Sequence, residues 1–126
     1  MKVGTENTIE IIVTNEKTAR TMGSGTLDVF ATPAMIALME QTAAESVESM
    51  LEPGQTSVGT LINAQHLAST PIGMKVVCKS VLKSADGRKL VFDIEVRDEV
   101  DLIGKAEHHR FIVDGERFLK KTNEKI

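Results

Sequence analysis

The sequence predicts an α+β fold in which one long helix lies against one antiparallel sheet. Three observations predict it: residues 34–51 read as a single helix, five other segments have the composition or alternation of strands, and turn signals separate neighbouring segments. The chain has 126 residues, so we expect one domain over residues 1–126. A domain of this length buries roughly two-thirds of its unfolded surface and needs no disulfide or metal to fold.

The chain before the helix holds one predicted strand and a loop. Residues 8–14 read Thr-Ile-Glu-Ile-Ile-Val-Thr, and this β-branched run predicts a strand. Residues 15–20 are compatible with a short helical turn, and residues 22–27 form a loop broken by glycines.

The helix has a clear start and a clear stop. Thr32 can cap its N-terminus and Pro33 suits its first position, while a Glu-Pro-Gly run at 52–54 ends it. Residues 34–39 are apolar on all sides, which predicts burial on nearly every side, whereas the half that carries Glu45 should reach solvent. One flat sheet covers only part of such a helix. We therefore expect a curved sheet that wraps the helix, or a second copy of the chain packed alongside.

The rest of the chain reads as about four antiparallel strands. The segments with strand-like alternation are 56–68, 74–83, 89–98 and 102–113. An Asp-Gly pair at 86–87 predicts a hairpin between the second and third of them. After a turn at 114–115, residues 116–119 predict a short extension, and the tail at 120–126 is expected to fray.

Composition excludes several classes of protein. The chain has four Phe, no Trp and no Tyr, and a net charge of −3, so a nucleic-acid-binding surface is disfavoured. The single cysteine, Cys78, cannot form an internal disulfide and is predicted to be a core residue. The N-terminal residues lack the apolar stretch of a signal peptide, and no apolar run approaches the ~20 residues of a membrane span. We therefore expect a cytoplasmic protein without membrane contact.

Glu40 is the first candidate for chemistry. It follows six apolar residues on the predicted helix, so we expect its carboxylate to be at least partly desolvated. Carboxylates in such surroundings act as bases or nucleophiles. The alternative is that Glu40 and Gln41 form a thin, solvated polar stripe on the helix.

His66 and Thr32 are the next candidates. The strand face expected to carry His66 is otherwise small and apolar, with Val58, Thr60, Ile62, Ala64 and Ala68. His66 is then either a core histidine with a satisfied hydrogen bond or a proton-transfer group. Thr32 is either the helix cap or part of a site with Glu40. Eight residues span about 12 Å along an ideal helix, so contact between Thr32 and Glu40 needs a folded-back loop or a subunit boundary.

Two groups of charged residues lie on the predicted strands. His108 and Arg110 share one strand face and His109 takes the other. No spacing of Cys, His and carboxylate matches a standard zinc motif, so we expect no metal. A strand face with three lysines is either an exposed, solubilising edge or a strip that meets ligand phosphates: Lys75, Lys79 and Lys83.

Several short runs resemble the fluoroacetyl-CoA thioesterase family, whose members have the hotdog fold and work as dimers. The runs cover most of the chain, roughly residues 3–118, and the spacing from Thr32 to Glu40 to His66 matches without a gap. They are Val29-Phe30-Ala31-Thr32, Leu38-Met39-Glu40, Leu51-Glu52-Pro53-Gly54, Ser57-Val58-Gly59-Thr60, His66, residues 68–73, Gly87-Arg88-Lys89-Leu90, Asp101-Leu102-Ile103-Gly104 and Arg110.

The resemblance implies an acyl-CoA thioesterase with a catalytic Thr32, Glu40 and His66. In this reading Glu40 is the nucleophile or the base for water, His66 shuttles the proton to the leaving thiolate, and Thr32 orients Glu40. Gly59 corresponds to a family glycine beside the acyl group, and Arg110 to an arginine near the acyl pocket. Phe30 is expected to contact the substrate.

The resemblance also implies a hotdog fold, a homodimer or dimer of dimers, and no cofactor beyond the CoA of the substrate. The loop at 22–27 is shorter than the loop of the fluoroacetyl-specific type, and no second Phe precedes Phe30. This departure favours a general short- or medium-chain acyl thioesterase. Two alternatives use the same fold: a non-catalytic acyl-CoA binder or sensor, and a hydratase or dehydratase that acts on acyl thioesters.

Overall fold

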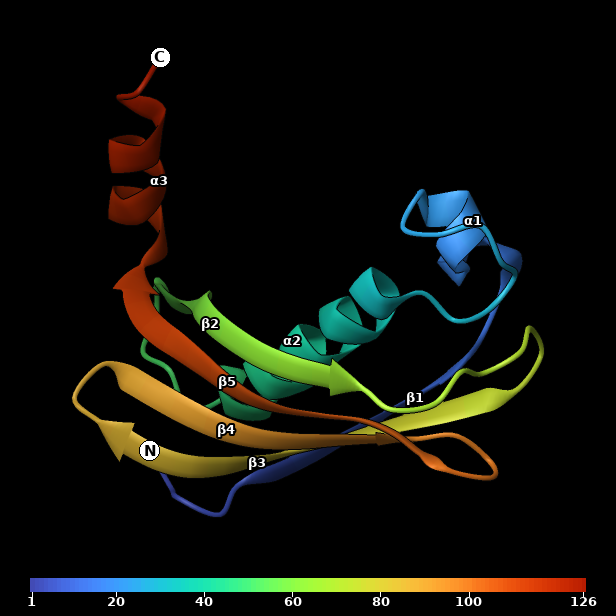
Figure 1. Ribbon diagram of the computed structural model, residues 1–126. Helices are drawn as coiled ribbons and strands as arrows, with labels where there is room; N and C mark the ends of the chain where they lie inside the picture. Colours follow the sequence, from blue (N-terminus) through green and yellow to red (C-terminus); the bar gives the residue numbers. More distant parts are fainter.

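The computed structural model describes residues 1–126 and has the predicted α+β architecture. A curved antiparallel sheet of five strands holds one long helix against its concave face (Figure 1). The elements in chain order are β1 (Glu6–Ile12), a 3-10 turn η1 (Asn15–Lys17), α1 (Ala19–Met22), α2 (Thr32–Glu48), β2 (Gln55–His66), β3 (Lys75–Asp86), β4 (Lys89–Arg97), β5 (Leu102–Asp114) and α3 (Gly115–Asn123).

The strand order in the sheet is β1-β3-β4-β5-β2, and every pair is antiparallel. The predicted hairpin joins β3 to β4 through Gly87, whose φ of 60° favours a residue without Cβ. β1 and β2 lie at opposite edges of the sheet, and the long connection that contains α2 joins them.

The start of α2 corrects the predicted cap. Ala31 is the N-cap residue and makes no side-chain cap hydrogen bond, while Thr32 and Pro33 are already helical. The Thr32 hydroxyl is therefore free for another partner. The helix ends at Glu48, three residues before the predicted end.

The helix buries one face against the sheet and leaves another uncovered. Its buried residues are Met35, Leu38, Met39, Thr42, Ala43 and Val47. Ala37 is exposed and Ile36 is half-buried, so the expected burial of residues 34–39 on nearly every side is not reached within one chain. The curved sheet covers only the side of the helix that faces it.

A β-bulge in β2 changes which side chains face the helix. The register with β5 shifts between Gly59 and Leu61. Ser57, before the shift, is buried, and Ile62, after it, packs against the core. The expectation that Val58 and Ile62 lie on one continuous face is therefore wrong, because the extra residue inverts the alternation.

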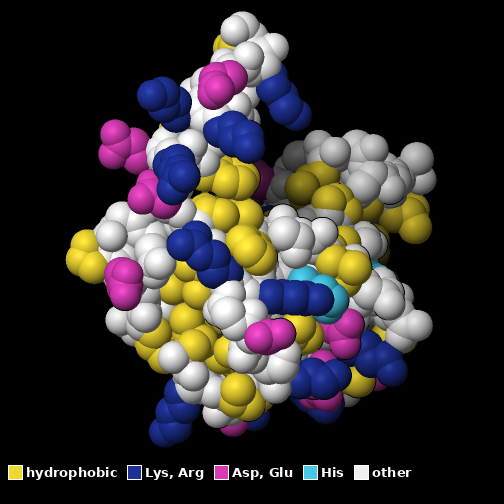
Figure 2. All heavy atoms as spheres, turned by 90° about the vertical axis from the view of Figure 1, so that its left-hand side faces the viewer, with side chains coloured by type: hydrophobic (Ala, Val, Ile, Leu, Met, Phe, Trp, Pro, Cys, Tyr) yellow, Lys and Arg dark blue, Asp and Glu magenta, His cyan; other side chains and the backbone are white.

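The C-terminal segment forms a helix where a short extension and a frayed tail were predicted. The Asp114 side chain caps α3 by accepting a hydrogen bond from the Arg117 backbone N–H at 3.1 Å. The helix projects from the end of β5, away from the sheet (Figure 1). Lys and Arg side chains surround it in the space-filling view (Figure 2).

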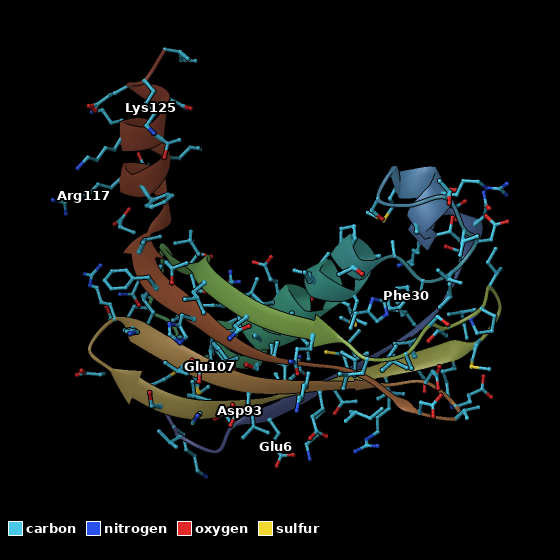
Figure 3. All side chains as sticks on the ribbon, viewed as in Figure 1. Glu6, Phe30, Asp93, Glu107, Arg117 and Lys125 are labelled. Atoms are coloured by element: carbon cyan, nitrogen blue, oxygen red, sulfur yellow. The ribbon has the colours of Figure 1, made fainter.

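The outer face of the sheet carries charged pairs, and the carboxylates Glu6, Asp93 and Glu107 of these pairs lie on the side away from α2 (Figure 3). The pairs are Lys75–Glu10 at 3.4 Å, Lys79–Glu6 at 3.0 Å, and Lys83 with Asp93 at 3.8 Å and Glu107 at 3.5 Å. Because each lysine has a carboxylate partner, the reading of this strip as a phosphate site loses support. The strip is also not an edge, since β3 lies between β1 and β4.

Cys78 is fully buried in the core, as predicted, and burial raises the pKa of its thiol to about 11. The thiol is therefore a packing group that stays protonated at neutral pH. None of the helices combines the length and the hydropathy that a membrane crossing requires.

Candidate active site

Thr32 and His66 meet where the start of α2 lies beside the end of β2. The Thr32 Oγ1 and His66 Nδ1 atoms are 2.8 Å apart, a hydrogen-bond distance. The ring of Phe30, which is almost fully buried, stands edge-on to the His66 ring with centroids 6.4 Å apart. Phe30 and Thr32 thus hold the imidazole from two sides. Both line a hollow together with Leu67 and residues of the preceding loop.

The other nitrogen of His66 has no partner. Nε2 is buried and makes no hydrogen bond within the chain. Burial lowers the pKa of His66, and the nearby Ala68 backbone partly opposes this shift. The Thr32 hydroxyl can donate or accept, and the neutral tautomer in which Nδ1–H donates to Thr32 Oγ1 leaves Nε2 as the bare proton acceptor. An unpartnered buried nitrogen is rare in folded proteins and marks a place where a further group belongs.

Glu40 lies on the middle of α2 and faces the bulge of β2. Its Oε2 is 3.6 Å from the Arg110 Nη1. The carboxylate also lies against the Gly59 backbone: a Cβ on Gly59 would stand only 2.6 Å from Glu40 Oε2. The Glu40 side chain keeps 42% of its surface exposed, so it is partly desolvated within one chain, as expected, and still open to solvent. Gly59 therefore makes room for a reachable carboxylate.

Arg110 is buried and held at both edges of its guanidinium. Nε donates to Ser57 Oγ at 2.8 Å and Nη2 donates to the Ser57 carbonyl at 2.9 Å. Nη1 lies 3.2 Å from His108 Nε2 and faces Glu40. The bulge in β2 places Ser57 and Gly59 on the side of the sheet that faces Arg110.

Sequence reasoning missed Ser57 and His108 as members of this group. The placement of His108 on the same strand face as Arg110 was predicted, and that shared face was the available signal. Ser57 had no such signal, because the bulge that turns it inward depends on the pairing of two distant strands. His109 takes the opposite face, where its Nε2 is 3.1 Å from Glu107 Oε2.

The sequence candidates therefore form two groups within one chain. Thr32 and His66 make the first group, and Glu40, Gly59 and Arg110 make the second. No hydrogen bond joins Thr32 to Glu40; the Thr32 hydroxyl binds His66. The expectation that Thr32 orients Glu40 directly is thus not met within a single chain. About 12 Å of helix separates the two positions along the axis.

Neither group resembles a metal centre. The chain contains no cluster of three or more His, Cys, Asp or Glu side chains placed to hold an ion. The chemistry available at the two groups is acid–base and nucleophilic: a carboxylate, a neutral imidazole, a hydroxyl and a fixed guanidinium.

Comparison of the sequence with known proteins identifies the family of this chain. Residues 13–116 match the family model described as fluoroacetyl-CoA-specific thioesterase. The chain is 35% identical to the fluoroacetyl-CoA thioesterase of Streptantibioticus cattleyicolor over an alignment of 131 positions, which covers 99% of this chain and 94% of that protein.

Solved structures agree with the sequence match. The fluoroacetyl-CoA thioesterase FlK has a TM-score of 0.95 at 35% identity, with 100% of this chain and 98% of that chain covered. A hot-dog-like protein from Thermanaerovibrio acidaminovorans has a TM-score of 0.91 at 21% identity, covering 100% and 93% of the two chains, and supports the fold alone. The chain therefore belongs to the fluoroacetyl-CoA-specific thioesterase family, whose members are hotdog-fold thioester hydrolases.

Proposed function

We propose that this protein hydrolyses short- or medium-chain acyl-CoA thioesters to a free acid and CoA. The observation that carries the proposal is the Glu40 carboxylate, which lies against the Gly59 backbone and 3.6 Å from the buried Arg110 guanidinium. This arrangement offers a nucleophile or base beside a glycine backbone and a fixed cation, which suit a carbonyl that develops negative charge. The relative from Streptantibioticus cattleyicolor, a fluoroacetyl-CoA thioesterase, supports the same substrate class.

The proposed reaction assigns one role to each residue. Glu40 takes a proton from the water that attacks the thioester carbonyl carbon, or attacks that carbon itself and forms an acyl–Glu40 anhydride that water then hydrolyses to the free acid. The carbonyl oxygen becomes an oxyanion beside the Gly59 N–H, and the C–S bond then breaks. His66 Nε2 takes up the proton that the attacking water releases, directly or from Glu40, and passes it to the thiolate, while Thr32 holds the ring through Nδ1. No cofactor is required beyond the CoA that forms part of the substrate.

We further propose that the working unit is a homodimer that joins the two groups. His66 Nε2 lacks a partner within the chain. Thr32 and His66 lie at the N-terminal end of α2, whereas Glu40 lies in the middle of the helix. A second copy could place its Glu40 beside His66. The uncovered face of α2, with Ala37 exposed, also supports a partner.

The two edge strands of the sheet differ in charge, and this difference favours β2 as the strand that pairs with a second copy. The other edge strand, β1, carries Glu6 and Glu10, charges that oppose further strand pairing. The 12 residues of β2 include no Lys, Arg, Asp, Glu or Pro. A long edge without these blocking residues is suited to pairing with its own copy about a two-fold axis. Sedimentation at micromolar concentration should then give twice the 13.7 kDa of the chain.

The hollow beside Glu40 supports a short acyl group. Its volume is about 210 Å³, below the ~300–1,000 Å³ typical of pockets for drug-sized ligands. It therefore holds the acyl end of the substrate and not the nucleotide. The residues that line it are Glu40, Gly59, Thr60, Leu61, Ile62 and His108.

A thiol-release assay tests the proposal. Purified protein is offered acetyl-, butyryl-, hexanoyl-, phenylacetyl- and fluoroacetyl-CoA, with Glu40→Ala and His66→Ala beside it. We expect hydrolysis by the parent protein and a loss of about 10²–10⁴-fold in both variants, the usual contribution of a proton-transfer group. Glu45→Ala and His109→Ala are matched controls, because Glu45 is an exposed residue on α2 and His109 lies on the outer face.

The alternatives give different results in the same material. Binding of intact acyl-CoA in a calorimeter without thiol release would favour a binder or sensor. Hydration of crotonyl-CoA would favour a hydratase. Full turnover in both Glu40→Ala and His66→Ala would contradict the assigned residues even if the protein hydrolyses thioesters.

A further inference from the structure

His108 lies between the bulge of β2 and Arg110, and its two ring nitrogens have different partners. Nδ1 is 2.8 Å from the backbone carbonyl of Leu61, and Nε2 is 3.2 Å from Arg110 Nη1. Only 1% of the residue is exposed, and its ring lies against Phe92 with centroids 6.1 Å apart. The imidazole therefore has little freedom to turn.

These partners assign the tautomer. A carbonyl oxygen only accepts, so Nδ1 must carry the proton that it donates to Leu61. A guanidinium nitrogen only donates, so Nε2 must be the bare acceptor. One neutral tautomer satisfies both contacts, and the protonated imidazolium satisfies only the first.

The Nε2 contact controls where Arg110 points. The guanidinium is planar, and Ser57 fixes its Nε and Nη2 edge at 2.8 and 2.9 Å. Nη1 carries two hydrogens, and His108 takes one of them. The second hydrogen is left to face Glu40, whose Oε2 lies 3.6 Å away.

We propose that neutral His108 is a positioning residue for thioester hydrolysis, which fixes Arg110 against Glu40 by accepting a hydrogen bond at Nε2. The inference rests on the proposed function, since it assigns His108 a part in the same site. His108 acts through Arg110, and its contact with Leu61 also holds the bulge that turns Gly59 toward Glu40.

The surrounding charges agree with a neutral ring. Burial lowers the pKa of His108, and the Arg110 and His109 charges lower it further, while the hydrogen bond to Leu61 and the Glu40 charge oppose the shift. Protonation would set two cations in contact and remove the acceptor for Nη1. The positioning is therefore lost at a pH at which His108 gains a proton.

Two amide substitutions separate the two contacts. His108→Gln can place an amide oxygen near the position of Nε2 and accept from Arg110. His108→Asn can place an amide N–H near Nδ1 and donate to Leu61, but it leaves Arg110 Nη1 without its acceptor. His109→Gln, on the outer face of the same strand, is the matched control.

We expect His108→Asn to lower kcat for the best acyl-CoA substrate about 10–100-fold with a smaller change in KM, and His108→Gln to recover most of that loss. His109→Gln should stay within about twofold of the parent. Thermal midpoints are measured for all three variants. A loss in His108→Gln equal to or larger than that in His108→Asn, or losses that simply follow the midpoints, would overturn the proposal.

A second measurement does not depend on turnover. Nitrogen-15 NMR of imidazole-labelled protein at pH 7 should show His108 neutral, with its proton on Nδ1. A proton on Nε2 would overturn the proposal whatever the kinetics show. If the parent protein hydrolyses no acyl-CoA while the tautomer is as expected, the proposed function fails and the hydrogen-bond assignment of His108 stands.

Discussion

The two halves of the candidate site differ in how completely one chain builds them. Around Arg110, four groups hold the side chain: the Ser57 hydroxyl, the Ser57 carbonyl, His108 and Glu40. Around His66, one hydroxyl holds Nδ1, and Nε2 is buried without a partner. A network of short contacts thus preorganises the charged half within one chain, whereas the imidazole half leaves one nitrogen without a partner there, which is the reason for proposing that a second copy completes it.

The largest expected effect comes from mixing two inactive variants. If Glu40 of one chain works with His66 of another, a Glu40→Ala/His66→Ala heterodimer contains one intact site and one doubly altered site. Random exchange in an equal mixture then restores about one quarter of the parent activity. Thiol release after mixing and subunit exchange measures it.

Two controls define this result. Each variant alone, treated in the same way, should stay inactive. A mixture that remains as inactive as its components, although mass spectrometry shows exchanged dimers, would mean that one chain supplies the whole site.

A pair of glycines sharpens the contrast between site and core. An alanine at Gly59 meets the flexible end of Glu40 at 2.6 Å, so we expect turnover to fall on the order of 100-fold with little change in stability. An alanine at Gly104 meets Sδ of the fully buried Met35 at 2.5 Å, so we expect overpacking to cost about 1–3 kcal/mol. Thiol release and urea unfolding of both variants measure the two effects. A fully active Gly59→Ala protein would contradict the close approach of Glu40 to that backbone.

The single hydrogen bond at His66 should give a smaller effect. Thr32→Ala removes the hydroxyl that holds Nδ1, and we expect kcat/KM to fall about 3–10-fold, in line with about 0.5–1.5 kcal/mol for one hydrogen bond. Thr32→Ser keeps the hydroxyl and should recover most of the activity. The helix should be unaffected, because Ala31 and not Thr32 is the N-cap. Equal rates in the parent and Thr32→Ala would show that the ring needs no such support.

The smallest expected effect is the pH dependence of stability. The pKa values of His66 and His108 are lowered in the folded chain, mainly by burial, from the ordinary value of 6.5. Below pH 6.5 the unfolded chain binds protons that the folded chain does not, so the free energy of unfolding falls as the pH falls through this window. The stabilisation is fully present above pH 6.5 and is lost as the folded pKa values are passed.

Urea unfolding between pH 7.5 and pH 5 measures this loss. The matched comparison is a His66→Gln, His108→Gln double variant, whose stability should vary less over the same range. The carboxylates with lowered pKa titrate at lower pH than these two histidines; they are Glu16, Asp98 and Glu107. A parent protein whose stability rises toward pH 5 would contradict the direction of both shifts.

Most of the fold could be predicted from local pattern. The alternation at 74–83 and 89–98, with Asp-Gly between them, predicted the hairpin of β3 and β4, with the end of β3 three residues beyond the predicted one. The apolar run from residue 34 predicted α2. The helix α3 was missed because its sequence is mostly charged, and its Asp114 cap is a short signal at the end of a long strand.

The site was predicted less completely. Glu40, His66 and Thr32 were singled out from their surroundings in the sequence, and the family resemblance supplied their catalytic roles and added Gly59. No local pattern gives the distances between these residues. Ser57 was missed because it faces Arg110 only through the bulge, which forms where β2 pairs with β5. His108 was predicted on the face of Arg110, but its contacts with Leu61 and Arg110 are tertiary. The hydroxyl of Thr32 was expected to cap the helix or to orient Glu40, and it binds His66.

Local pattern was enough for the α+β class, the long helix, the strand segments and the family, because periodicity and residue spacing are properties of the chain alone. The strand order, the division of the candidate residues into two groups, the orientation of Arg110 and the tautomer of His108 were not accessible in this way. These depend on contacts between residues such as Ser57 and Arg110, which lie 53 positions apart. A hydrogen bond at that separation exists only after the sheet has brought its two partners together.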